Sequence, residues 1–229
     1  MDANVAFIAA MELLLLLLSI SIHECCHALA AERMGDPTGR MVGRVSLNPF
    51  RHMDPLGSVF LPGLLLAFGW PLFGWGRPTP IVDDNVKPGG LVGAWPHLAG
   101  PAANFALAAL ATLCLPAAVH LFGPAARDVG MAVLSRQLGS AVEMAGFPVM
   151  FTLIRLATLN AFLGVFNLIP LPPLDGGKVA LRLLPPDWAA RLVGFHPYSF
   201  LLGIVPAMAA AILLLVPFHG LLMVVINVS

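Results

Sequence analysis

The sequence predicts an all-α polytopic membrane protein, a helical bundle with a small membrane-associated β-structure and re-entrant segments. Of its 229 residues, 59% are hydrophobic and only 10% are charged, whereas soluble domains carry about 25% charged residues. Four apolar stretches, at about 4–33, 95–123, 143–168 and 200–226, are long enough to cross a bilayer, since a spanning helix needs about 20 residues. We expect one membrane-embedded domain over residues 1–229, with a core at about 4–185 and an additional C-terminal helix at about 200–226.

The first stretch is apolar from Val5 to Ile22, as a signal peptide would be. However, the acidic residues Asp2 and Glu12 replace the basic residues of a signal peptide, and no small-residue cleavage site follows. The apolar pattern continues without a break into the motif HECCH at 23–27, which cleavage would destroy. We therefore expect the first helix to be retained.

The region between the first two long stretches is more irregular. A turn cluster, GDPTG at 35–39, precedes residues 40–47, in which apolar and polar side chains alternate. A period of two predicts a short strand there, and RPTPIV at 77–82 is a second candidate that its prolines would confine to a sheet edge. The apolar run at 56–75 is interrupted by Pro62, Gly63, Gly69 and Pro71, so it is either a span or a re-entrant segment.

Charge excludes one class of partner and predicts an orientation. The formal net charge is +0 and the pI is near 7.1, which gives no support for nucleic-acid binding. If the first helix ends in the cytoplasm, nine of the twelve Lys and Arg residues fall on the inner side, and Arg127, Arg136 and Arg155 on the other. Because cytoplasmic loops carry an excess of Lys and Arg, this orientation is favoured.

The most informative motif is the HECCH pentapeptide, which contains His23, Glu24 and His27 near the end of the first helix. Residues four apart share one helix face, so the two imidazoles can converge on a single zinc ion, and Glu24 lies close enough to polarise a bound water. The pentapeptide also occurs by chance in unrelated proteins. Here, however, ionisable groups stand in an apolar helix, where they are costly, and this favours a metal site.

Catalytic zinc usually needs a third protein ligand, and Asp175 is the best candidate. It follows the segment LIPLPPL at 168–174, in which three prolines break the preceding helix. Broken backbone at membrane depth is tolerated only where it is buried in protein or lines a watery cavity, so the acid marks a polar site. The alternative is that Asp175 caps the helix that Gly176 begins, and both roles can coexist.

The two motifs together constrain the topology. Each lies at the C-terminal end of its helix, so the two helices must run in the same direction for His23 and Asp175 to share a depth. An odd number of crossings must therefore separate them. The stretch at 95–123 supplies one crossing, so we expect the run at 56–75 to be re-entrant.

Four patches in this order resemble the site-2 proteases, the intramembrane metalloproteases of regulated membrane proteolysis. The patches are HECCH at 23–27, GDPTGRMVGRVSLNPFRHMDPLGS at 35–58, AGPAAN at 99–104 and NLIPLPPLDGG at 167–177, and FGWGRPTP at 73–80 extends the match. The resemblance implies a core of three helices with one Zn²⁺ ion, bound by His23, His27 and the Asp175 of an LDG motif. It also implies Glu24 as the general base and suggests Asn167 as a donor near the developing oxyanion.

The resemblance further implies a membrane-embedded β-structure after the first helix, with which an unwound substrate strand can pair. It implies a minimal form without PDZ or CBS domains, in a prokaryotic inner or plasma membrane, with the active site toward the cytoplasmic side. The implied partners are the lipid bilayer and membrane-protein substrates that contain a transmembrane segment. Asn104 either orders the site or contacts substrate, or it makes a helix–helix hydrogen bond, and the same alternatives apply to Asn167.

The function predicted from these patterns is that of an intramembrane zinc metalloprotease, which hydrolyses peptide bonds in the transmembrane segments of other proteins. The alternative is a non-hydrolytic zinc-binding membrane protein or a metal transporter. Against this alternative, the intramembrane acids and histidines gather at one site rather than along a path through the membrane.

Overall fold

The structure is a computed structural model, and it describes residues 3–68, 70, 72–86, 90–194 and 196–228. The α-helices within these ranges are α1 (Ala3–Arg33), α2 (Thr38–Met41), α3 (Leu61–Ala67), α4 (Gly90–Phe122), α5 (Pro124–Leu134), α6 (Phe147–Asn167), α7 (Asp175–Leu183), α8 (Pro186–Gly194) and α9 (His196–Val228). Shorter turns of helix are a π-helix at Pro55–Phe60 and 3₁₀-helices at Pro49–Arg51, Asp83–Asn85 and Gly139–Glu143.

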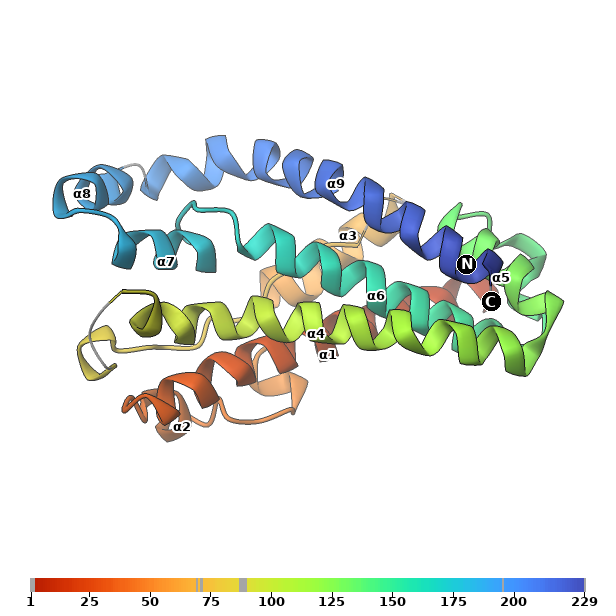
Figure 1. Cartoon of the computed structure of the whole chain (residues 1–229), viewed down its shortest axis with the longest axis horizontal. Helices are drawn as coiled ribbons and strands as arrows, with labels where there is room; N and C mark the ends of the chain where they lie inside the picture. The colour runs from red at the N-terminus through yellow and green to blue at the C-terminus, as the bar shows by residue number, and fades with distance from the viewer. Residues whose placement is uncertain (1–2, 69, 71, 87–89, 195, 229) are drawn as a thin grey trace.

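Four of the described helices are long and apolar enough to cross a membrane, namely Ala3–Arg33, Val92–Phe122, Phe147–Asn167 and Met208–Val228. They coincide with the four stretches expected from the sequence, so the prediction of a helical polytopic membrane protein is confirmed. Figure 1 shows both termini at one end of the bundle beside α5, and α2, α7 and α8 at the other end. Helix α4 packs against both α1 and α6 and returns the chain between them, so α1 and α6 run in the same direction.

The largest apolar cluster among the described residues lies in the half of the bundle near the termini (Figure 1). Phe147, Met150, Phe151 and Ile154 of α6 are fully buried there, and the rings of Phe147 and Phe151 are stacked 5.3 Å apart. They pack with buried side chains of α4, α5 and α9, which are Leu115, Val119, Ala126, Val129, Leu222 and Ile226. This packing holds α9 and α5 against the three helices that lead to the opposite end.

A buried ion pair joins α1 to α6 beside this core. Arg155 Nη2 lies 2.8 Å from Glu12 Oε1, and Glu12 is only 8% exposed. Charges at membrane depth are costly unless they are paired. The pair therefore fixes the position of α1 along the axis of α6. This alignment matters because α1 carries His23 and α6 leads the chain to Asp175.

The prediction of a strand at 40–47 is wrong, because Thr38–Met41 is helical and is followed by a turn at Gly43, which has a φ of +75°. Asp36 Oδ1 accepts hydrogen bonds from the backbone N–H and the hydroxyl of Thr38, which starts a helical turn instead of a strand. The side chain of Arg44 then ties this loop to its neighbours, because Nη1 donates to the carbonyls of Arg51 and Arg77. A tertiary side-chain contact thus replaces the expected ladder.

The interrupted run at 56–75 begins and ends in the same part of the structure, because the residues that flank it, Met53 and Gly76, are paired. Residues 69 and 71 of this run lie outside the described ranges. Asp54 caps the π-helix at Pro55–Phe60, which continues into α3. The chain then returns without regular secondary structure, and Met53 and Gly76 form an isolated antiparallel bridge. The segment at 77–82 has no strand or ladder among the described residues.

Asp36 connects the loop after α1 to the segment at 82–85. The residue is fully buried, and its carboxylate accepts from Thr38, from Val82 N–H at 2.7 Å and from Asn85 Nδ2 at 3.2 Å. Burial alone would raise the pKa of Asp36, but these donors hold the pKa below its usual range. The ionised form therefore stabilises the fold above the ordinary Asp pKa of about 3.9, and this contribution is lost at more acidic pH.

The Asp36→Asn variant should unfold at a lower temperature, because the new NH₂ group must face one of these donors. We expect a loss of about 1–3 kcal/mol, the cost of leaving a buried donor without an acceptor. Thermal unfolding of the purified protein in detergent, followed by tryptophan fluorescence, measures it. The exposed neighbour Asp84→Asn is the control, and equal melting temperatures for the two variants would contradict this role.

Candidate metal centre

The last turns of α1 bring two imidazoles together. His23 and His27 are buried at 7% and 3% exposure, and their Nε2 atoms lie 3.0 Å apart. The rings meet edge to face with centroids separated by 4.6 Å. This is the one-face arrangement that the spacing of four residues predicts.

Asp175, the first residue of α7, completes the cluster. Its Oδ2 atom lies 3.0 Å from the Nε2 atoms of both His23 and His27. The chain can turn this tightly because Gly176 and Gly177 lack side chains, since a Cβ atom at either position would lie 2.2–2.3 Å from backbone atoms of Leu168 or Pro172. Leu174 is the N-cap residue of α7 and no side chain caps the helix, so the alternative role of Asp175 as a cap is not the one that the structure adopts.

The three side chains fit a tetrahedral metal ion. Zinc bonds of about 2.0–2.1 Å place neighbouring ligand atoms about 3.3 Å apart, close to the separations of 3.0 Å here. The far nitrogen of each ring already has an acceptor: His23 Nδ1 lies 2.5 Å from Asn104 Oδ1, and His27 Nδ1 lies 2.6 Å from the Pro96 carbonyl. Such outer partners orient metal-binding histidines and leave Nε2 for the ion. Among the described residues, this is the single group of three or more His, Cys, Asp or Glu that could hold a metal.

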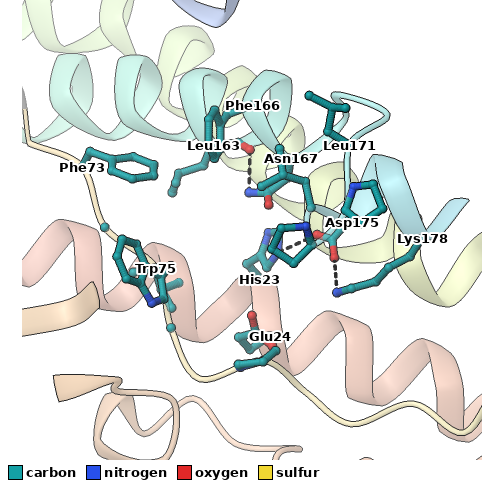
Figure 2. A pocket seen from close by; sticks show the side chains of 17 residues that line it. His23, Glu24, Phe73, Trp75, Leu163, Phe166, Asn167, Leu171, Asp175 and Lys178 are labelled. Carbon is teal, nitrogen blue, oxygen red and sulfur yellow. Dashed lines mark hydrogen bonds and ion pairs between the residues drawn. The ribbon is translucent and has the colours of Figure 1, made fainter. Parts of the chain in front are cut away.

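Lys178 holds the other oxygen of the Asp175 carboxylate, with Nζ 2.8 Å from Oδ1 (Figure 2). Burial would raise the pKa of Asp175, but His27, His23 and Lys178 hold the pKa well below its usual range. Burial opposes ionisation of Lys178 as well, and Asp175 nevertheless raises the pKa of the ammonium. The carboxylate is thus kept ionised, with one oxygen directed at the imidazoles and the other at a cation.

Glu24 faces the same space from the next position on α1. Its Oε2 atom accepts from the backbone N–H of Thr79 at 2.7 Å, and the Thr79 hydroxyl donates to the Glu24 carbonyl at 3.0 Å. The segment at 77–82 therefore positions Glu24, a contact that the sequence patterns did not indicate. One oxygen of the Glu24 carboxylate is thus anchored by the backbone of Thr79.

A cavity of ≈ 320 Å³ opens on this cluster. Figure 2 shows His23, Glu24, Asp175 and Lys178 at one part of its wall and Phe73, Trp75, Leu163 and Phe166 at another. Asn167 also lines the cavity, and its Nδ2 atom donates to the Leu163 carbonyl at 2.9 Å. The site is thus a polar corner of a mostly apolar chamber.

All six residues singled out in the sequence lie at or directly behind this centre. His23, Glu24, Asn167 and Asp175 line the cavity, His27 is the third member of the cluster, and Asn104 contacts His23 from behind. Asn104 contacts His23 at the site and also makes a helix–helix hydrogen bond to Asn160 of α6, so the two alternatives predicted for it do not exclude each other. Lys178, Thr79 and Asn160 were missed. Only Lys178 had a sequence signal, its place three residues after Asp175 on a helix.

Four apolar helices around a buried cluster of two histidines and an aspartate, with a glutamate beside it, define an integral membrane protein with a metalloprotease-type centre. The comparisons identify the family. Residues 95–204 match the model of Peptidase family M50, a range that includes Asn104, Asn167 and Asp175 but not the HECCH motif. The chain is 34% identical over 190 residues to YwhC of Bacillus subtilis. This alignment covers 83% of the chain and 76% of YwhC.

Two further relatives are Rip2 proteins, at 30% identity over 200 residues in Mycolicibacterium smegmatis and 31% over 198 residues in Mycobacterium tuberculosis strain Erdman. Each alignment covers 82% of this chain but 63% of the relative, so the chain spans less than two thirds of the Rip2 proteins. YwhC and Rip2 carry zinc metalloprotease names. No solved structure matches the chain. The chain belongs to peptidase family M50, the site-2 protease family.

Gly100 of α4 supplies the space for the cluster, because a Cβ atom there would lie 2.3 Å from His27 Nε2 and 2.7 Å from His23 Nε2. The Gly100→Ala variant should therefore lose most of its bound zinc, with an affinity at least about tenfold weaker, as for other changes that misplace metal ligands. Metal analysis of the purified protein and competition with a chelator measure this. Gly220→Ala, where a Cβ atom meets nothing within 4 Å, should bind zinc normally. Normal zinc binding by both variants would show that the space at Gly100 is unimportant.

Lys178→Met should also weaken zinc binding, by about tenfold, because the Asp175 carboxylate loses the partner that fixes its rotation. Lys178→Arg keeps a cation in reach of Oδ1 and should bind zinc almost as tightly as the wild type. Chelator competition on the two variants measures the difference. If the Met and Arg variants were equal, the ion pair would have no role in orienting Asp175.

Proposed function

We propose that this M50 family member is a zinc endopeptidase that hydrolyses peptide bonds in the transmembrane segments of membrane proteins. His23, His27 and Asp175 are the proposed ligands of one Zn²⁺ ion, and Glu24 is the proposed general base. The observation that carries the proposal is the convergence of these three ligand atoms within 3.0 Å of one another, beside Glu24, at the end of apolar helices. The transporter alternative has no comparable support, because the described residues contain this one candidate metal cluster.

The residues around the site divide the work of hydrolysis. When bound, zinc supplies Lewis-acid polarisation of the scissile carbonyl and of the attacking water. Glu24 takes the proton of that water on the oxygen not held by Thr79, and later delivers it to the leaving amine. The NH₂ group of Asn167 donates one hydrogen bond to the Leu163 carbonyl, and with its second N–H it donates to the oxyanion.

The proposed substrate is an unwound segment that adds as an extra strand to the chain at 73–78. Trp75 and Arg77 direct their N–H groups at the carbonyls of Gly57 and His52. Gly76 forms the isolated bridge with Met53, and backbone groups alternate in direction along a strand, so we propose that the groups of Gly74 and Gly76 face the cavity that both glycines line. An unwound helix needs partners for its own backbone, and strand addition supplies them. The membrane-associated β-structure that we propose is thus the pairing of a substrate strand with residues 73–78.

The run at 56–75 is proposed to be re-entrant. Its helical part, Pro55–Ala67, has 13 residues, and 13 residues of helix reach only about 20 Å, less than the bilayer core of about 30 Å. The bridge between Met53 and Gly76 supports entry and exit on one side.

We further propose a bacterial cell membrane as the location, with the site toward the cytoplasm. The relatives named above are bacterial proteins. Of the eleven Lys and Arg residues within the described ranges, eight belong to the segments at the end where α1 terminates (Figure 1), which agrees with the positive-inside rule. The site lies at the same end as α7 and α8, away from the termini.

Glu24→Gln should reduce cleavage of a reporter with a transmembrane segment by about 10²–10⁴-fold, the usual contribution of a general acid–base group. Zinc content should stay near that of the wild type, because Glu24 is not among the proposed ligands. Cleavage is measured in proteoliposomes and zinc by metal analysis. Glu32→Gln is the control, because Glu32 lies two turns further along α1 and its partly exposed side chain pairs with Arg40, away from the metal centre. Undiminished cleavage by the Glu24 variant would refute the role of this residue.

A further inference from the structure

Three buried polar side chains form a chain behind the metal centre, one from each of the helices α1, α4 and α6. Ser19, Asn104 and Asn160 are all 0% exposed. Asn160 Nδ2 lies 2.9 Å from Ser19 Oγ, Asn160 Oδ1 lies 2.7 Å from Asn104 Nδ2, and Asn104 Oδ1 lies 2.5 Å from His23 Nδ1. The chain leads from the apolar middle of the bundle to a proposed zinc ligand.

Two helix carbonyls fix the direction of every hydrogen bond in this chain. Asn160 Nδ2 also lies 2.9 Å from the Leu156 carbonyl, and a carbonyl can only accept, so the atom facing it must be the NH₂ group. Ser19 donates its hydroxyl hydrogen to the Leu15 carbonyl at 2.7 Å, so its oxygen accepts from the same NH₂ group. Both hydrogens of Asn160 are then used, and its Oδ1 faces Asn104.

The same logic continues to the imidazole. Asn104 must donate from Nδ2 to Asn160 Oδ1, which leaves its Oδ1 atom facing His23. An acceptor at Nδ1 requires the ring to carry its hydrogen there, because a neutral imidazole has one N–H group. The lone pair of Nε2 is therefore directed at Asp175 and His27, where a metal ligand atom is needed.

We propose that Asn160 is a positioning residue for zinc, which acts through Asn104 to hold His23 in the tautomer with hydrogen on Nδ1. The inference rests on the zinc site proposed above. If Asn104 turned its amide over, its NH₂ group would face Nδ1 and favour hydrogen on Nε2, the atom that must bind the metal. Asn160 prevents this turn because its only group facing Asn104 is an acceptor.

The first measurement needs no variant. In metal-free wild-type protein labelled with ¹⁵N-histidine, at a pH where both rings are neutral, the His23 signals should show hydrogen on Nδ1, with assignment from His23→Gln. Hydrogen on Nε2 would overturn the proposal even if every variant failed to fold.

The second measurement is the zinc affinity of Asn160→Leu, by chelator competition. We expect affinity to fall about tenfold, at the lower end of the range for outer-shell changes, and the single His23 tautomer to be lost. Thr158→Val is the matched control, because Thr158 is also a buried polar residue of α6 but its hydroxyl bonds within its own helix, to the Ile154 carbonyl. Affinity of Asn160→Leu within twofold of the wild type would overturn the proposal.

A double variant separates positioning from packing. A carboxylate at position 104 has only acceptor oxygens, so Asn104→Asp should keep the His23 tautomer whether or not Asn160 is present. Asn160→Leu should then cost little zinc affinity in the Asn104→Asp background. If it cost the same tenfold in both backgrounds, Asn160 would act by packing alone and the proposal would fail. Wild-type protein that bound no zinc at all would instead refute the function proposed above.

Discussion

The structure depends on one constraint, the meeting of two imidazoles and a carboxylate whose residues lie 148 and 152 positions apart in the chain. Groups of this kind are costly inside an apolar bundle unless each finds a partner. They can meet only if α1 and α6 run in the same direction and if His23 of α1 and Asp175, which follows α6, lie at the same depth. The return of the chain through α4, and the inward and outward path of the segment at 53–76, follow from that requirement.

Polar contacts inside the bundle set the relative positions of the helices. Glu12 pairs with Arg155, and Ser19 pairs with Asn160, so α1 and α6 are joined at two levels before they reach the metal centre. Apolar packing alone would allow one helix to slide along the other, because lipid-facing and helix-facing surfaces are both apolar. Buried polar pairs permit one alignment, and this alignment brings His23 to Asp175.

Several glycines of the motifs are needed because they have no side chain, and they take no part in the chemistry. Gly100 lets α4 approach the imidazoles, and Gly176 and Gly177 let the chain after the prolines fold back on the start of α7. The segment at 77–82 has the opposite task, since Thr79 fills the space beside Glu24 and orients its carboxylate. Close approach of the backbone thus complements the side-chain contacts of Asn104 and Lys178, which orient His23 and Asp175.

Local periodicity and composition were sufficient to predict the four apolar helices and the face shared by His23 and His27, because helix geometry repeats every few residues. The proline-broken segment before it indicated Asp175 as a third ligand, and the resemblance of the ordered motifs implied the same residue. The strand at 40–47 was predicted wrongly, because the side chains of Asp36 and Arg44, which bond to residues far along the chain, override the local alternation. Only the tertiary structure revealed Lys178 beside Asp175, Thr79 beside Glu24 and Asn160 behind Asn104. The contacts of Thr79 and Asn160 join segments that are distant in the sequence, so they exist only once the helices have packed, whereas the spacing of Lys178 and Asp175 is local.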